Sequence, residues 1–433
     1  MHWKIIMKPA VFGVPHLKTI QDQLRFDLEK KIVKHQVEIE CWFRGQWLKH
    51  KPLFYCSVDL RNAGFKLAAV DTNVFPGGFN NLNPDFLPLC VQAATQTLSQ
   101  LYPNCNNILI LAESHTRNPH YLKSLHILQT ILTQAGFNIR IGTLRPIDDK
   151  ETFNLPDATI VQWPIVRKDN RIVCADFEPC IVLLNNDLSE GVPEILQNLK
   201  QPIIPELTMG WNIRSKYDHF LHYELNASKL ASILNIDPWL IVPLFSQCID
   251  VDFLSSEKDA CIIEKAEELF EAVVKKYKEY QIKHKPFLVI KSDAGTYGMA
   301  VLMVKEVKEI LNLNRKQRTK MSTRKGGMQV DKVLIQEGVY TMEAKENQAT
   351  AEPVVYMIGS YVIGGFYRIH TGRGMQDNLN APGMHFEPLA FDTCCNTPDE
   401  RLSPHDSKNQ FYAYSVIARL AHLATRHEQG SSK

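Results

Sequence analysis

A lysine and a glycine loop follow a strongly apolar stretch and could together hold phosphate groups. Residues 287–290 predict a buried strand that runs into Lys291, and the loop after it carries Gly295 and Gly298 before a second apolar run. Glycines let backbone N–H groups approach phosphate oxygens closely, and a lysine adds a positive charge. A simple hairpin whose glycines serve the turn has the same pattern. This segment by itself therefore leaves a phosphate clamp and a plain hairpin open.

Polar residues also interrupt two predicted strands further along the chain. Gln336 and Glu337 lie in the apolar run 333–339, and residues 352–368 predict two strands that end in Arg368. An arginine can stabilise the negative charge that develops during group transfer, and losing one such donor typically costs about 3 to 4 kcal/mol. The alternative for Arg368 is a surface salt bridge.

Acidic and amide side chains lie near the N-terminus. Asp59 lies in the predicted strand 53–60, and Asp71 and Asn73 follow the next predicted strand. By themselves, Asp71 and Asn73 favour an Asx-type turn before Pro76.

The order of these features resembles the ATP-grasp ligases. The resemblance covers the lysine strand, the glycine loop, the Gln-Glu step, the pair of strands and their final arginine. It implies a mixed α/β and α+β fold in which ATP lies between two subdomains, and in which Arg368 steadies an acyl-phosphate intermediate. The residues that the resemblance assigns to ATP binding are Lys291, Gly295, Thr296, Tyr297, Gly298, Met299, Gln336, Glu337 and Val339.

One part of the pattern is displaced along the chain. In glutathione synthetases, which share the pattern, it continues into a strand with a Glu-x-Asn pair of magnesium ligands, and nothing after Asn380 matches that strand. Residues 57–59 and 69–78 look like the missing strand pair. We therefore predict a circularly permuted ATP-grasp fold whose N-terminal acidic and amide residues bind Mg²⁺.

Four regions are expected from this resemblance. Residues 1–85 complete the ATP-grasp core, residues 86–255 form an α/β domain with an open parallel sheet, residues 256–390 bind the nucleotide, and residues 391–433 add a C-terminal helix that packs on the core. In the ATP-grasp family, the α/β domain contributes a second lysine to the nucleotide site. Lys216 is the candidate, with a solvated lysine on a helix surface as the alternative.

Three segments narrow the resemblance to a bacterial glutamate-cysteine ligase family. They are residues 71–82, 291–299 and 364–368, and the match covers nearly all 433 residues. It implies that ATP phosphorylates the γ-carboxylate of L-glutamate, that the amine of L-cysteine attacks the acyl phosphate, and that γ-glutamylcysteine, ADP and phosphate leave. The residues expected to bind the substrates are Arg61, Arg373, Asn378 and Asn380, with Arg61 and Arg373 as alternatives for one carboxylate. Two alternatives stay open: a related ligase with different amino-acid substrates, and an ATP-binding sensor without turnover.

Hydrophobic periodicity predicts the supporting elements. Helices are expected over 17–36, 120–134, 257–283 and 410–427, and further strands over 65–70, 108–111, 137–141, 159–162, 181–184 and 202–204. Residues 312–329 instead combine many basic side chains with two glycines. We expect a mobile loop there, with its charges either solvated or placed as a lid over phosphates.

Composition excludes several classes of protein. Lys plus Arg total 49 against 47 for Asp plus Glu, and a net charge of +2 argues against nucleic-acid binding. No stretch approaches the roughly 20 apolar residues that span a membrane, and no signal-peptide pattern is evident, so we expect a cytoplasmic protein. The ten cysteines lack the paired spacings of a metal site and are expected to be free thiols in a reducing compartment. The sequence leaves a homo-oligomer open.

Overall fold

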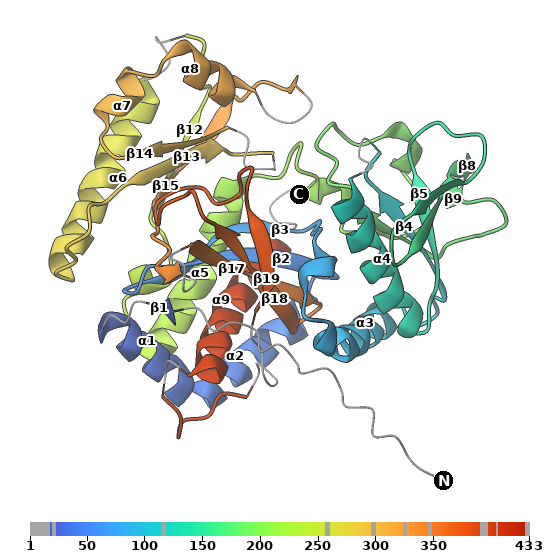
Figure 1. The fold of residues 1–433 in the computed structure, drawn as a ribbon, viewed down its shortest axis with the longest axis horizontal. Coiled ribbons are helices and arrows are strands. Elements are labelled where there is room, and N and C mark those ends of the chain that lie inside the picture. Colours follow the sequence, from blue (N-terminus) through green and yellow to red (C-terminus); the bar gives the residue numbers. More distant parts are fainter. Residues whose placement is uncertain are drawn as a thin grey trace.

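The structure is a computed structural model that describes residues 18–19, 23–114, 118–255, 260–295, 300–323, 327–344, 349–389, 397–403 and 406–428. Its strands form three larger sheets and one small hairpin. In Figure 1, a seven-stranded sheet lies between a four-stranded sheet and a six-stranded sheet. Within the described residues, no helix is long and apolar enough to cross a membrane.

The seven-stranded sheet joins segments from both ends of the chain. An N-terminal hairpin pairs with the long hairpin near the C-terminus through β2 and β17, and every one of these pairings is antiparallel. The strands are β1 (Lys18–Thr19), β2 (Tyr55–Asn62), β3 (Leu67–Asn73), β16 (Glu343–Ala344), β17 (Thr350–Ile358), β18 (Tyr361–His370) and β19 (His385–Pro388). Blue strands therefore lie beside orange ones in Figure 1.

Four helices cover one face of this sheet. Helix α9 contacts both strands of the N-terminal hairpin, and its residues 411–425 are all buried. Around it lie α1 (Gln23–Lys34), α2 (Gln36–Lys49) and α5 (Lys216–Leu234), with α9 itself running over Ser407–Glu428. The last helix is therefore a core element, as its apolar composition requires.

The six-stranded sheet has the order β11-β10-β4-β5-β7-β6. Its strands run parallel except at the β6 edge. The elements are α3 (Leu87–Leu101), β4 (Asn107–Ala112), α4 (Pro119–Gln134), β5 (Asn138–Thr143), β6 (Glu151–Asn154), β7 (Thr159–Pro164), β10 (Ile181–Asn185) and β11 (Ile203–Ile204), with a separate hairpin of β8 (Val166–Lys168) and β9 (Arg171–Val173). A parallel sheet presents the carboxyl ends of its strands at one edge, where ligands commonly bind.

The four-stranded sheet has the order β12-β15-β13-β14. Its strands are β12 (Phe245–Ile249), β13 (Leu288–Ser292), β14 (Val301–Val304) and β15 (Lys332–Glu337). Helix α6 (Ala260–Glu279) packs on β12 and β15. Its buried residues Ile262, Ala266, Leu269, Val273 and Tyr277 form the stripe that the sequence predicts, whereas the expected helix start at 256–259 lies outside the described residues.

The prediction of a mobile loop over 312–329 is wrong for residues 315–322, which form a helix. The segment contains helix α8 (Arg315–Ser322), which follows the short helix α7 (Lys308–Leu311). A capping box forms between Asn314 and Gln317, and Met321 is buried at the helix end. Reciprocal capping satisfies two backbone donors, and one buried side chain anchors the last turn, so a highly charged segment still folds.

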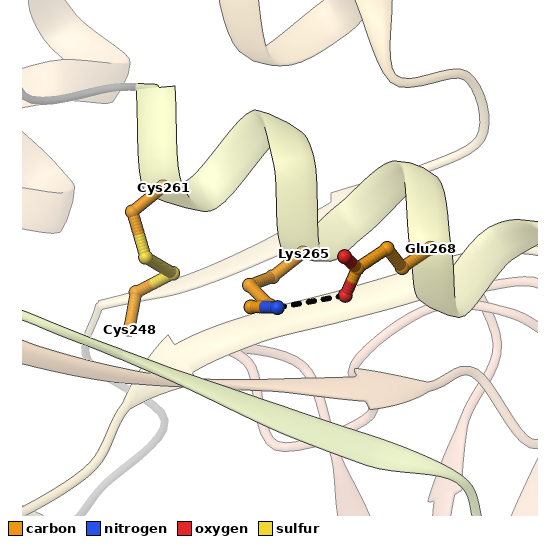
Figure 2. The surroundings of a disulfide bond; sticks show 4 residues. All are labelled: Cys248, Cys261, Lys265 and Glu268. Carbon is orange, nitrogen blue, oxygen red and sulfur yellow. Dashed lines mark hydrogen bonds and ion pairs between the residues drawn. A yellow bond between two sulfur atoms is a disulfide. The ribbon is translucent and has the colours of Figure 1, made fainter.

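The prediction that all cysteines are free thiols is also wrong. Cys248 of β12 and Cys261 of α6 form a disulfide (Figure 2), with their Cα atoms 6.1 Å apart. Packing of α6 on the sheet brings together two residues that the sequence separates by 13 positions. The neighbouring Lys265 and Glu268 form an exposed ion pair along the same helix. The adjacent cysteines Cys394 and Cys395 lie outside the described residues.

Candidate active site

Two pockets share one wall. The first lies between the seven-stranded and four-stranded sheets and has about 670 Å³ of empty space, and the second lies between the seven-stranded and six-stranded sheets. The residues that line both pockets are Asp59, Asp71, Arg368 and Asn380. All four were predicted as site residues, and the fold gathers them from segments about 300 positions apart.

Two β-bulges place the charged residues on one face of the seven-stranded sheet. The bulge between β2 and β3 sets Asp59 opposite Asp71, and the bulge between β17 and β18 sets Glu352 opposite Arg368. A bulge inserts one residue into a strand and so changes which side chains share a face. Without these insertions, Asp71 and Arg368 would point to the other face.

The charges on this face form a nearly closed network. Arg368 donates from Nη1 to Asp59 Oδ2 at 2.9 Å and also pairs with Glu352, whose Oε2 accepts from Arg61 Nε at 3.0 Å. Burial raises the pKa of the Asp59 carboxyl against the opposing charge of Arg368. Glu352 was missed by the sequence analysis, because its role depends on the bulged register rather than on a local motif.

The guanidinium of Arg368 is not fully hydrogen-bonded within the described part of the chain. Its Nε is buried and has no hydrogen-bond partner among the described residues, although Nη1 and Nη2 face Asp59. Unsatisfied buried donors are rare in folded proteins and commonly mark binding sites. The surface salt bridge considered as an alternative for Arg368 does not describe this arrangement, because the side chain lines both pockets.

Two lysines approach Asp71 from other parts of the chain. Lys291 donates to the carbonyl of Val70 at 2.7 Å and to Gln336 Oε1 at 3.0 Å, and Lys216 donates to the carbonyl of Gly295 at 2.6 Å. The pKa of Asp71 is lowered, because the lysine charges outweigh burial, which acts in the other direction. Lys216 is buried rather than solvated, so it reaches the glycine loop as the resemblance implied.

The carboxylate pair suits a hard cation. Asp59 and Asp71 face each other across the β2–β3 ladder and line both pockets, which gives oxygen ligands of the kind that Mg²⁺ prefers. Asn73 fits less well, because its Oδ1 already accepts from Phe75 N at 2.9 Å and from Trp211 Nε1 at 3.3 Å. It therefore forms the Asx turn that was its alternative. Among the described residues, no group of three or more His, Cys, Asp or Glu side chains is arranged to hold a metal ion.

The first pocket also contains the residues predicted for the adenine side. Gln336, Glu337 and Val339 all line it. Gln336 Nε2 is buried without a partner in the described part of the chain, whereas the Glu337 carboxylate pairs with Lys66 Nζ at 2.6 Å. The predicted ATP-binding residues Thr296, Tyr297, Gly298 and Met299 lie outside the described residues.

Comparison with known proteins assigns the chain to a family. The glutamate-cysteine ligase family model matches residues 29–429. The chain belongs to the glutamate-cysteine ligase family. A crystal structure named "Putative gamma-glutamylcysteine synthetase", from Methylobacillus flagellatus KT, is 48% identical, with a TM-score of 0.91 over 98% of this chain and 100% of that one. Membership of the glutamate-cysteine ligase family makes the protein a ligase that joins glutamate to cysteine.

Other comparisons are weaker. A D-alanyl-alanine synthetase A from Vibrio cholerae is 12% identical, with a TM-score of 0.36 over 73% of this chain and 81% of that one. A glutathione synthetase-like effector from Globodera pallida is 11% identical, with a TM-score of 0.39 over 84% of this chain and 83% of that one. Among curated proteins, no match to the sequence is found.

The two arginines predicted as alternatives for one substrate carboxylate differ in position: Arg61 lines the first pocket, and Arg373 lines neither described pocket. Arg61 donates to Glu352 and to the carbonyl oxygens of Val339 and Asp377, which occupies its guanidinium within the protein. Arg373 is exposed and is not among the residues that line the two described pockets. Asn378 and Asn380, by contrast, line the first pocket, and Asn380 also lines the second.

Proposed function

We propose that the protein uses ATP to join the γ-carboxylate of L-glutamate to the amine of L-cysteine, the first step of glutathione biosynthesis. The γ-carboxylate attacks the terminal phosphorus of ATP to give γ-glutamyl phosphate and ADP. The neutral amine of cysteine then attacks the acyl carbon, and phosphate leaves. The observation that carries this proposal is the wall shared by the two pockets, because it lets a nucleotide and an amino acid meet at Arg368. A cytoplasmic location is part of the proposal.

The first pocket suits the nucleotide. Its lining combines the apolar side chains of Val289, Val301 and Met303 with the buried cation of Lys291. Phosphoryl transfer depends on positioning and charge neutralisation and needs no nucleophile from the enzyme. Apolar walls with one cation therefore match a purine and its phosphates.

The shared wall suits the chemical step. When bound there by Asp59 and Asp71, Mg²⁺ would neutralise phosphate charge. The unpartnered Nε of Arg368 can donate to the oxygen atoms of the transferred phosphoryl group. Asn380 offers an amide to either pocket.

The second pocket suits the amino acids. It is larger, with about 1690 Å³ of empty space, and its lining mixes aromatic, amide and acidic side chains. Two of the acidic residues, Glu113 and Asp187, follow the carboxyl ends of the parallel strands β4 and β10. Open parallel sheets bind ligands at that edge.

The proposal includes a circularly permuted ATP-grasp fold with the four regions stated above. What supports it is the N-terminal hairpin β2–β3, which carries Asp59 and Asp71 and pairs with β17 through β2. In this arrangement, residues 1–85 supply the metal-binding strands of a nucleotide site whose lysine and glycine loop come from residues 256–390.

The first test is ADP release by the purified protein with ATP, Mg²⁺ and L-glutamate, with and without L-cysteine, followed by mass analysis of the product. We expect cysteine-dependent ADP release and a product with the mass of γ-glutamylcysteine. Turnover with another amino acid but not with cysteine would favour the related ligase. Nucleotide binding without turnover across an amino-acid panel would favour the sensor.

A further inference from the structure

Residues 211–217 connect two parts of the candidate active site. Trp211 donates from Nε1 to Asn73 at the end of β3, and the ammonium group of Lys216 lies 3.8 Å from the centroid of the Trp211 ring. The backbone N–H of Lys216 donates to the carbonyl of Asp293 at 2.8 Å, next to the glycine loop. This segment therefore contacts both the end of β3 and the residue that follows β13.

Arg214 makes the contact of this segment with the helix α9. Its guanidinium binds both carboxylate oxygens of Glu428, with Nε to Oε2 at 2.7 Å and Nη2 to Oε1 at 3.1 Å. The remaining nitrogen, Nη1, donates to the carbonyl of Thr72 at 2.6 Å. His219 Nδ1 lies 2.6 Å from Glu428 Oε1 and closes the cluster. Bidentate pairing fixes the plane of the guanidinium and so fixes the direction of its third donor.

The anchored carbonyl belongs to the residue between Asp71 and Asn73. Thr72 pairs with Val58 across the β2–β3 ladder, beyond the bulge that turns Asp71 toward the pockets. Because Thr72 directly follows Asp71, a charged hydrogen bond to the Thr72 carbonyl limits rotation of the strand end that carries Asp71. The Arg214 and Glu428 side chains are 3% and 7% exposed, so solvent screens this interaction little.

We propose that Arg214 is a positioning residue for Asp71, and that Glu428 in the last turn of α9 holds Arg214 in the required orientation. The inference rests on the proposed function, because it takes Asp71 as a ligand of the catalytic Mg²⁺. It makes the C-terminal turn of α9 a part of the active site, although neither Arg214 nor Glu428 lines the two described pockets.

The test compares two charge-neutralising variants, each of which removes the carboxylate from an arginine–glutamate pair that involves α9. Glu428→Gln removes the carboxylate that orients Arg214. Glu40→Gln is the matched control, because Glu40 also binds both outer nitrogens of a buried arginine of α9, Arg419, at 2.8 Å each. Both proteins are titrated with Mg²⁺ in the presence of a non-hydrolysable ATP analogue, and kcat and KM are measured for each substrate.

We expect Glu428→Gln to raise the Mg²⁺ concentration for half-saturation about tenfold, the size typical of groups that orient metal ligands. We expect kcat to fall with it, while the affinity for the analogue without Mg²⁺ stays close to that of the parent protein. Glu40→Gln should change none of these quantities. Arg214→Lys, which keeps the charge but not the bidentate geometry, should resemble Glu428→Gln.

Equal Mg²⁺ half-saturation in the Glu428 and Glu40 variants would overturn the inference. If Glu428→Gln does not fold, Glu428→Asp and Arg214→Lys give the same comparison, and parent-like Mg²⁺ binding in both would also overturn it. Failure of the proposed function looks different, because the parent protein would then show no cysteine-dependent ADP release before any variant is made.

Discussion

The four-stranded and seven-stranded sheets bring opposite kinds of chemistry to the shared wall. The four-stranded sheet contributes the cation of Lys291, whose hydrogen bonds go to a carbonyl and an amide, both neutral groups. The seven-stranded sheet contributes carboxylates and guanidinium groups that largely neutralise one another around Glu352. A lysine whose hydrogen bonds go to neutral groups can bind an anion without breaking an ion pair. In a cluster of paired charges, by contrast, ion pairs must rearrange when negative charge develops on the substrate. The first sheet therefore suits binding and the second suits turnover.

The largest expected effect tests the turnover side. Arg368→Lys should lower kcat by about 10² to 10³-fold, because a lysine cannot place the Nε donor of the guanidinium at the shared wall. The KM for ATP should change far less. Arg61→Lys is the control. Arg61 also pairs with Glu352, but its other N–H groups donate to backbone carbonyl oxygens. Steady-state kinetics with thermal unfolding would measure both, and equal losses of kcat would contradict the assignment.

The next effect tests the binding side. Lys291→Met should raise the Kd for ATP about 10- to 150-fold, because a charge-assisted hydrogen bond contributes about 1.5 to 3 kcal/mol. It should leave kcat at saturating ATP much less affected. Calorimetric titration of the nucleotide, beside steady-state kinetics, would separate the two quantities. A large loss of kcat with unchanged Kd would reverse the roles of the two sheets.

Lys66, which lies between β2 and β3, provides a contrast to Lys291. It is fully buried against Glu337 of β15, and Lys66→Met would leave that carboxylate without its cation. We expect the free energy of unfolding to fall by about 3 to 5 kcal/mol, while the ATP Kd of the folded protein stays near that of the parent. Urea unfolding and calorimetry would check both values. A weakened ATP affinity without loss of stability would show that Lys66, too, serves the nucleotide.

A smaller effect concerns the metal. Asp71→Asn should raise the Mg²⁺ concentration for half-maximal activity by about tenfold, equivalent to about 1.4 kcal/mol, because an amide is a weaker ligand than a carboxylate. Asn73→Ser, which keeps a side-chain oxygen for the Asx turn, should leave the Mg²⁺ requirement near its original value. Activity measured against free Mg²⁺ tests both. If Asn73→Ser raised the Mg²⁺ requirement more than Asp71→Asn does, Asn73 rather than Asp71 would be the metal ligand.

The smallest effect is a pH dependence of ATP binding. Burial lowers the pKa of Lys216 to about 8 against the opposing charge of Asp71. The lysine is therefore charged below pH 8 and loses its charge as the pH rises above it. We expect the Kd for ATP to rise by at most about tenfold between pH 7 and about pH 9, and Lys216→Met to remove the dependence. If the Kd for ATP still rises with pH by the same factor in Lys216→Met, the group that titrates is not Lys216.

The two sheets also differ in how readily the sequence revealed them. In the four-stranded sheet, the lysine, the glycine loop and the Gln-Glu step lie within about fifty positions, and each falls at the end of a strongly apolar run. The charge network of the seven-stranded sheet joins Asp59 to Arg368 and Arg61 to Glu352, each across about 300 positions. Glu352 has no local signal and was missed, and no local pattern indicated that Arg61 pairs with it.

Hydrophobic period and short motifs are local properties, so the sequence predicted many of the elements, including α4 and α6, together with the acidic N-terminal strands and the family, but not α2, α3 or α5. The tertiary structure alone decided which charges meet. Two bulges select the faces of Asp71 and Arg368, the packing of α6 on β12 joins Cys248 to Cys261, and a capping box with one buried methionine orders a basic segment. Register, helix packing and burial depend on partners far away in the chain, and no local pattern encodes them.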